Sequence, residues 1–190
     1  IHPIITRGGS VVNAVPDDVR METFVRGSSI NAIRSANEKV DRALRAGALA
    51  VGATVEITTL PGYLPLAPDE NLTSLHRANA EALVGRDRVH EFGRRGGSTD
   101  MGDLTQLMPG IHPYVGGAVG RSNHAEDMVV DDYNLAVLDA GKAMAMTVVD
   151  LLSNGASEGI RVISEHKPAM TKDEYLILQR AFLSERSYTE

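Results

Sequence analysis

The chain has 190 residues, no cysteine and a formal net charge of −6. A nucleic-acid surface needs basic residues to neutralise phosphates, so this acidic balance argues against a nucleic-acid partner. Without cysteine there are no thiolate ligands, so a metal site would use His, Asp and Glu, and the composition fits a cytoplasmic location. No apolar run reaches the ~20 residues that span a bilayer, so we expect no membrane partner.

The first 63 residues predict the order strand, strand, helix, strand. Ser28 and Ser29 are candidate N-caps for the helix, and Gly52 is placed to end it. This order suits an antiparallel sheet with a helix on one face. Strands are expected over residues 1–6, which are apolar and rich in β-forming residues, and over residues 18–26 and 54–60, where apolar and polar residues alternate. The helix is expected over residues 30–50.

Three prolines at 61, 65 and 68 indicate a linker, after which helices dominate. His76 is expected on the exposed side of the first of these helices. The predicted fold class is therefore α/β, with the chain divided at residues 63 and 64. Helices are expected over residues 69–83, 130–152 and 171–182, a helical turn over 104–108, and short strands over 89–92, 111–115 and 160–163.

A glycine-rich stretch over residues 96–128 contains several candidate metal ligands. Carboxylates and imidazoles close together suit a divalent metal of the zinc type. The spacing matches no closed zinc motif, so a loop surface with solvated side chains is an equal alternative. The acidic and histidine residues of this stretch are Asp100, Asp103, His112, His124, Glu126 and Asp127.

Two groups of residues resemble the metal-dependent amidohydrolase and metallopeptidase family, which includes aminoacylases, glutamate carboxypeptidases and aminobenzoyl-glutamate hydrolases. Ser98-Thr99-Asp100, Pro109, the GIHPY element and His124 with Met128 are similar to the family's C-terminal half. Gly8-Gly9, the run from Asn13 to Asp17 and Arg26 are similar to its lid, or dimerisation, domain. The resemblance extends to about Leu152 and is closest to the aminobenzoyl-glutamate and dipeptide hydrolases.

The resemblance implies a fold of two parts. Residues 1–63 would be a partial antiparallel-sheet lid of α+β type, lacking one strand and one helix of the family's lid. Residues 64–190 would be the C-terminal portion of a zinc-peptidase-like α/β catalytic domain.

The same resemblance implies roles for individual residues. Asn13 would be catalytic, donating its amide N–H to the oxyanion that forms from the scissile carbonyl; its alternative is a turn residue. Arg26 would hold a substrate carboxylate, with Gly97 also in the substrate site, although Arg26 could equally be a solvated surface residue. His124 would be a metal ligand.

Three further polar residues have less defined roles. Asp100 and His112 would support the metal site through hydrogen bonds, and a core position is an equal alternative for His112. His2 is shared with the hydrolase branch, and a structural role within the strand is expected for it.

The intact protein would then be a metal-dependent hydrolase, with zinc as the expected metal, acting on a small-molecule amide such as an N-acyl amino acid or a dipeptide. In the family, the other ligands and the general base lie in an N-terminal half, so this chain alone is expected to be inactive and to hold no metal. We expect a homodimer through the lid and a further partner in the missing half. The alternative is a non-catalytic association module.

Overall fold

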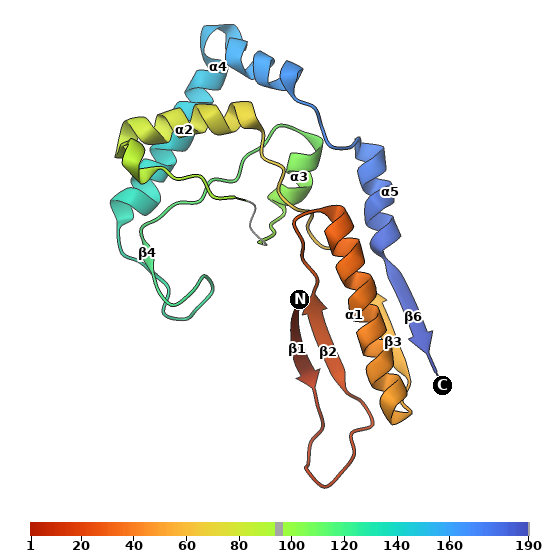
Figure 1. Cartoon of the computed structure of the whole chain (residues 1–190). Helices are drawn as coiled ribbons and strands as arrows, with labels where there is room; N and C mark the ends of the chain where they lie inside the picture. The colour runs from red at the N-terminus through yellow and green to blue at the C-terminus, as the bar shows by residue number, and fades with distance from the viewer. Residues whose placement is uncertain (94–96, 190) are drawn as a thin grey trace. The chain divides into compact units, whose positions relative to one another are not determined.

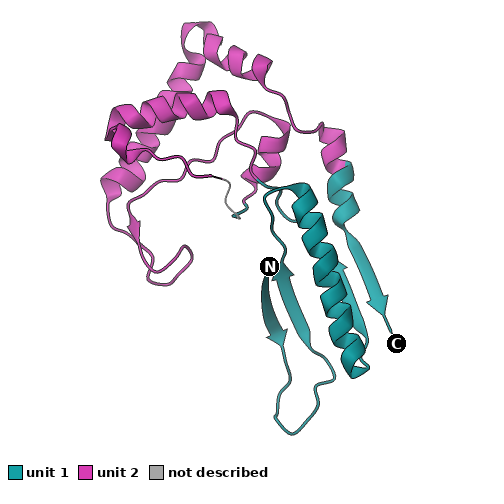
Figure 2. Cartoon of the chain, viewed as in Figure 1, with its two compact units in different colours: residues 1–65, 94–98, 177–190 teal, residues 66–93, 99–176 magenta. Residues whose placement is uncertain are grey.

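The computed structural model describes residues 1–93 and 97–189. The helices and small antiparallel sheets confirm a mixed α/β class (Figure 1). The chain forms two compact units, residues 1–65, 94–98 and 177–190 in unit 1 and residues 66–93 and 99–176 in unit 2 (Figure 2). Arg94 and Arg95, expected to be solvated, lie outside the described residues. No helix of the described chain is long and apolar enough to cross a membrane.

Unit 1 contains two antiparallel strand pairs and one long helix. The predicted order of strand, strand, helix and strand is confirmed, with the second strand shorter than expected. The single sheet expected from that order is instead two two-stranded sheets. The pairs are β1 (His2–Arg7) with β2 (Arg20–Phe24), and β3 (Val55–Thr59) with β6 (Ser184–Tyr188); the helix is α1 (Ile30–Val51).

Helix α1 begins and ends where its capping residues predict. The Ser29 hydroxyl accepts a hydrogen bond from the backbone N–H of Ala32 at 3.2 Å, which satisfies one of the free amides of the first turn. Gly52 ends the helix in the left-handed conformation with φ of 66°, which glycine adopts without a steric penalty. The helix contacts β3, whose Ile57 is buried.

The pairing of β3 with β6 was not expected from the sequence. Strand β6 has the sequence Ser-Glu-Arg-Ser-Tyr, which lacks the alternation of apolar and polar residues that predicts a strand. Its backbone pairs from Ser184 opposite Thr59 to Tyr188 opposite Val55. Residues 184–188 therefore form a strand because they pair with the edge of β3, and not because of their own β-propensity.

Unit 2 consists mainly of helices. Helices α2 and α4 contact each other, and α5 begins in unit 2 and continues into unit 1. The helices are α2 (Glu70–Val84), the 3₁₀ turn η1 (Arg86–Arg88), α3 (Met101–Leu107), the π-helix η2 (Asn134–Asp139), α4 (Ala140–Glu165) and α5 (Lys172–Phe182), and one short hairpin pairs β4 (Ala118–Val119) with β5 (Val129–Val130).

Three short strands predicted in this half are wrong. Residues 89–92 and 111–115 form no strand, and Pro113 could not donate a ladder hydrogen bond. Residues 160–163 are helical rather than a strand. The backbone leaves the helical conformation at Ser153 to Ala156, as expected for a helix that ends at residue 152, and a second helical segment then continues to Glu165. The helix expected from Val130 starts later, since Val129 and Val130 pair as β5.

A polar cluster joins α2 to α4. The Thr147 hydroxyl donates to the carbonyl of Ala143 at 2.7 Å, and it lies 3.3 Å from both the Asn79 amide nitrogen and Nδ1 of His76. A hydroxyl has one hydrogen, so His76 Nδ1 must be the donor in its contact. The expectation of a solvated His76 is therefore wrong, and burial lowers the pKa of its imidazole below the usual 6.5.

Asp69 connects three segments of unit 2. Its carboxylate accepts hydrogen bonds from the Leu72 backbone N–H at 2.9 Å, which caps α2, and from Nδ1 of His166 at 2.8 Å, just beyond α4. Its own N–H donates to the carbonyl of Gly110 at 3.0 Å. Burial by itself raises the pKa of Asp69, but the hydrogen bonds from Leu72 and His166 outweigh it and hold the pKa below the usual value.

The buried state of His76 predicts a pH-dependent stability. As the pH falls through 6.5, the unfolded chain takes up a proton at His76 while the folded chain, with its lowered pKa, does not. The unfolded state then binds more protons, so the free energy of unfolding should decrease between about pH 7 and pH 5. Chemical denaturation at several pH values measures this.

The control for that measurement is a second histidine. His76→Gln can still donate to Thr147 but cannot titrate, so its stability should fall less with decreasing pH. His90, which is exposed, provides the matched variant His90→Gln, whose pH dependence should match that of the unaltered chain. An equal loss of pH dependence in both variants would contradict the assignment to His76.

Candidate functional site

His124 lies in the loop that joins β4 to β5. Its side chain is exposed and its φ is 68°, in the left-handed region that residues other than glycine rarely adopt. Turn hydrogen bonds on both sides, from Ala125 N–H to Ser122 and from Met128 N–H to Ala125, fix the backbone around it. The loop therefore presents the imidazole to solvent.

The base of this loop needs a glycine. The carbonyl of Gly117 accepts hydrogen bonds from the N–H groups of Asp131 at 2.9 Å and Asp132 at 3.1 Å. A Cβ on Gly117 would lie 2.7 Å from the carbonyl oxygen of Asp132, and its φ of 91° is unfavourable for other residues. The glycines noted in the sequence here serve the backbone geometry that carries His124.

The two acidic residues after His124 pair with an arginine. Arg121 contacts the Asp127 carboxylate at 3.0 Å and Glu126 at 3.5 Å. These contacts are exposed, so they contribute little to stability. Both carboxylates thus have Arg121 as their ion-pair partner.

Asp100 is the N-cap of α3. Its carboxylate and the Thr99 hydroxyl both lie 3.0 Å from the Met101 N–H, so the Ser-Thr-Asp element forms the start of a helix. Gly97, the other predicted residue of this region, is exposed and lies outside any helix or strand. Asp103 follows in the first turn of α3.

His112 is half-buried and follows α3 without forming a strand. Its ring packs edge-on against Tyr114 with centroids 5.2 Å apart. Its Nδ1 is buried and has no hydrogen-bond partner among the described residues. Leaving a buried ring nitrogen without a hydrogen-bond partner costs free energy. The supporting role of His112, which would supply such a partner, stays a prediction.

The candidate residues of unit 1 lie in exposed positions. Asn13 is in the turn-rich connection between β1 and β2, and Arg26 follows β2 by two residues. The Arg26 guanidinium lies over the Phe24 ring, 5.2 Å from its centroid. His2 begins β1, opposite Phe24, and is exposed, so the expected burial of this histidine within the strand is wrong.

The described residues do not form a complete metal site. Among residues 1–93 and 97–189, no three His, Asp or Glu side chains are grouped closely enough to hold an ion. Zinc needs about three or four protein ligands, whereas the glutamate and aspartate nearest to His124 in sequence are directed toward Arg121. These residues therefore do not fit a zinc ion by themselves, and His124 can be one ligand at most.

Sequence reasoning missed a largely buried polar pair of unit 2. His166 and Asp69 have side chains 10% and 7% exposed, and Nε2 of His166 is buried without a partner among the described residues. The sequence signal for Asp69 was its place before α2, which predicts an N-cap. Nothing in the sequence around His166 indicates that it meets this carboxylate 97 residues away.

Comparison with known proteins gives two curated relatives. The chain is 30% identical over 186 residues to the Xaa-Arg dipeptidase of Mus musculus, covering 93% of this chain and 42% of the relative. It is 31% identical over 170 residues to the Xaa-Arg dipeptidase of Homo sapiens, covering 85% of this chain and 39% of the relative. The chain thus spans less than half the length of these relatives.

Two further comparisons give no match. No model of a known protein family matches the chain, and no solved structure matches it. The similarity to two dipeptidases supports a peptidase or amidohydrolase family for this chain.

The conformation of His124 predicts how its replacement affects stability. A residue other than glycine in the left-handed region costs about 1 kcal/mol, so His124→Gly should raise the free energy of unfolding or leave it unchanged. The adjacent Ala125→Gly has no such strain to relieve and should be destabilising. Denaturant titration measures both; a larger loss for His124→Gly than for Ala125→Gly would show that the imidazole is needed for folding.

Proposed function

We propose that this chain is part of a metal-dependent hydrolase that cleaves the amide bond of a dipeptide or an N-acyl amino acid. The exposed imidazole of His124, held in a strained conformation, carries the proposal, because strain of this kind persists where a side chain has a function. The similarity to two proteins named Xaa-Arg dipeptidase supports the reaction class and the dipeptide substrate.

His124 would be the metal ligand that this chain contributes. The remaining ligands and the general base would come from polypeptide outside these 190 residues, consistent with a chain that spans 42% of one relative. When bound in the intact protein, the metal, with zinc as the expected ion, would polarise the scissile carbonyl and activate water. The chain alone would then hold no metal and show no activity.

Asn13 would be the oxyanion donor. Its side chain lies exposed in the loop between β1 and β2, and no hydrogen-bond partner is found for it among the described residues. An amide N–H can stabilise a developing negative charge without itself ionising. A free side chain in this loop is available to a substrate, as the proposal requires.

Arg26 and Gly97 would bind the substrate. The stack of Arg26 on Phe24 orients the plane of the guanidinium, and no carboxylate of the described residues lies within 4.0 Å of it. A guanidinium held this way can receive a substrate carboxylate through two N–H groups. Gly97, without a side chain, would leave room for the substrate backbone.

Asp100 and His112 would support the site indirectly. One Asp100 oxygen is engaged by the start of α3, and the other has no partner among the described residues. The unpartnered Nδ1 of His112 is the second group that could hold a ligand in place. Both would act through hydrogen bonds to a metal ligand rather than by direct coordination.

A second candidate function is a non-catalytic association module. The β1–β2 pair exposes large apolar side chains, including Ile4 at 60%, Ile5 at 70% and Phe24 at 64%. Exposed apolar surface of this extent indicates contact with another polypeptide, and an uncovered strand edge can pair with a second copy. Homodimerisation through this lid is compatible with both candidates.

The oxyanion role predicts a specific kinetic defect in the intact protein. Asn13→Ala should lower kcat by about 10²- to 10³-fold, the usual loss for one such donor. KM should change much less, because the contact strengthens only in the transition state. Steady-state hydrolysis of a dipeptide measures both constants. Arg26→Ala is the contrasting variant, and its main effect should be a higher KM, since a carboxylate clamp binds ground and transition states alike.

The two candidate functions differ in whether subunits complement one another. If Asn13 acts across a dimer, mixing Asn13→Ala subunits with His124→Ala subunits of the intact protein should restore one complete site per heterodimer. Activity should then exceed that of either variant alone, measured after the mixture has exchanged subunits. Activity no higher than in the two parents would remove the cross-dimer role of Asn13, and an inactive intact wild-type protein would favour the association module.

A further inference from the structure

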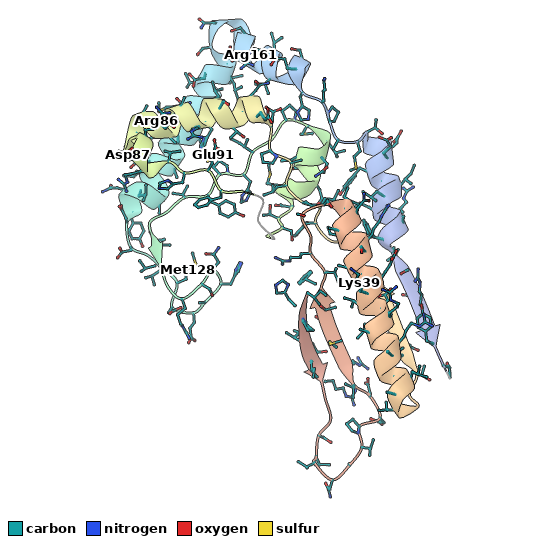
Figure 3. All side chains as sticks on the ribbon, viewed as in Figure 1. Lys39, Arg86, Asp87, Glu91, Met128 and Arg161 are labelled. Carbon is teal, nitrogen blue, oxygen red and sulfur yellow. The ribbon has the colours of Figure 1, made fainter. Side chains whose placement is uncertain are left out.

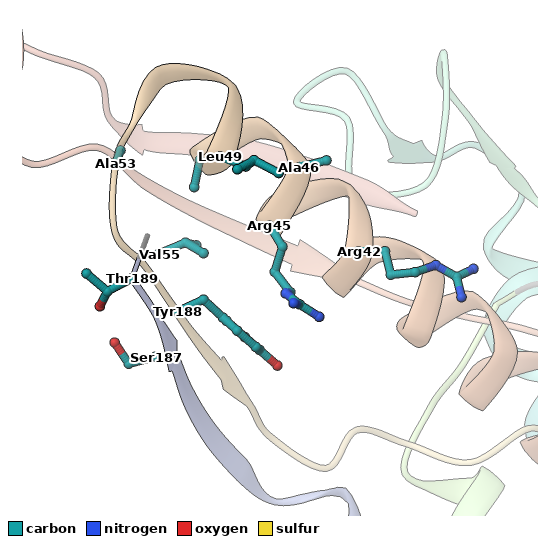
Figure 4. Close-up of a pocket in the computed structure, with 10 residues that line it drawn as sticks. Arg42, Arg45, Ala46, Leu49, Ala53, Val55, Ser187, Tyr188 and Thr189 are labelled. Atoms are coloured by element: carbon teal, nitrogen blue, oxygen red, sulfur yellow. The ribbon is translucent and has the colours of Figure 1, made fainter.

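Unit 1 contains a cavity that none of the candidate hydrolase residues lines. It lies between the C-terminal half of α1 and the paired strands β3 and β6, and its volume is about 630 Å³ (Figure 4). This volume is typical of sites for small molecules, which are about 300 to 1,000 Å³. Its walls include Arg42, Arg45, Leu49, Val55, Ser187 and Tyr188.

The charged wall consists of two arginines on neighbouring turns of α1. The Arg45 guanidinium carbon lies 4.2 Å from the centroid of the Tyr188 ring, and this cation–π contact fixes the plane of the guanidinium. No described carboxylate lies within 4.0 Å of Arg42 or Arg45. By contrast, Arg161 (Figure 3) is paired with Glu158 and Glu165, so no carboxylate of the described residues competes with an anionic ligand for Arg42 and Arg45 in the way that these glutamates would.

The cavity is also lined by apolar side chains. Leu49 of α1, the helix that carries both arginines, and Val55 of β3 line it together with small alanine side chains, and Leu49 is 54% exposed. The hydroxyl of Ser187 in β6 adds a hydrogen-bonding group to the lining. The cavity thus combines a fixed cation with apolar surface, which suits a ligand that has an anionic group on an apolar body.

We propose that this cavity binds a small amphipathic monocarboxylate. The carboxylate would accept two N–H bonds from the free edge of the Arg45 guanidinium, and Arg42 would add a second positive charge. The apolar part would cover Leu49 and Val55 and remove their surface from water. The carbonyl end of α1 carries a partial negative charge, so a multiply charged anion such as a phosphate is less suited than a monocarboxylate.

Octanoate is the probe that tests this site in the 190-residue chain. Isothermal titration should give one saturable site with Kd on the order of 1 mM or tighter. Octan-1-ol tests the charge and acetate tests the apolar part, and each should bind at least about tenfold more weakly than octanoate. Inorganic phosphate, as the multiply charged probe, should also bind more weakly.

Variants of the charged wall locate the binding. Arg45→Gln should weaken octanoate binding about tenfold, the value of one charge-assisted contact. Arg45→Lys keeps the positive charge but loses the planar guanidinium, so its affinity for octanoate should lie between that of the unaltered chain and that of Arg45→Gln. Arg34→Gln is the matched control. Arg34 is on α1, like Arg45, and its guanidinium carbon lies over the Phe182 ring, 5.7 Å from the centroid, but Arg34 does not line the cavity.

Three results would overturn the proposal. They are equal binding of octanoate and octan-1-ol, an equal loss in Arg34→Gln and Arg45→Gln, and no saturable binding of octanoate by a folded chain. If Arg45→Gln unfolds, as judged by circular dichroism, Leu49→Ser tests the apolar wall instead and should weaken octanoate binding while leaving acetate binding unchanged. Octanoate binding undiminished in Leu49→Ser would then overturn the proposal.

Discussion

The carboxylate of Asp69 is the interaction on which unit 2 depends. One of its oxygens caps α2 and the other accepts a hydrogen bond from His166 beyond α4, while its backbone N–H holds the segment at Gly110. Removing a buried acceptor of this kind would leave both donors without a partner, which costs more than one hydrogen bond contributes. Because the pKa of Asp69 is lowered in the folded state, this arrangement stabilises the fold at pH values above the usual carboxyl pKa. The stabilisation is lost as the pH falls through the lowered pKa.

Polar contacts have this importance because the described chain buries little apolar surface. Its buried apolar side chains are Ile57, Leu64, Ala143 and Val162. In unit 2 the contact between α2 and α4 includes the buried polar side chains of Asn79 and Thr147. A chain with so small a core and so much exposed apolar surface is expected to gain stability from association, which agrees with the proposal that it works with further polypeptide.

The residues of the proposed hydrolase site share one structural property, since Asn13, Arg26 and His124 all lie outside helices and strands and are exposed. Residues in connecting segments can approach a substrate, whereas the elements around them provide the rigid support. The cavity beside Arg45 is of a different kind, because it lies between a helix and a strand pair of one unit. A carboxylate bound there would be independent of hydrolysis.

The sequence by itself determined the elements whose signals are local. Ser29 and Gly52 predicted the ends of α1 because a cap depends only on the few residues around it, and alternation predicted β2 and β3. Tertiary structure alone decided β6, which is a strand because the edge of β3 pairs with it. It also decided the burial of His76 and the meeting of His166 with Asp69, because these depend on partners about 70 to 97 residues away that no local pattern specifies.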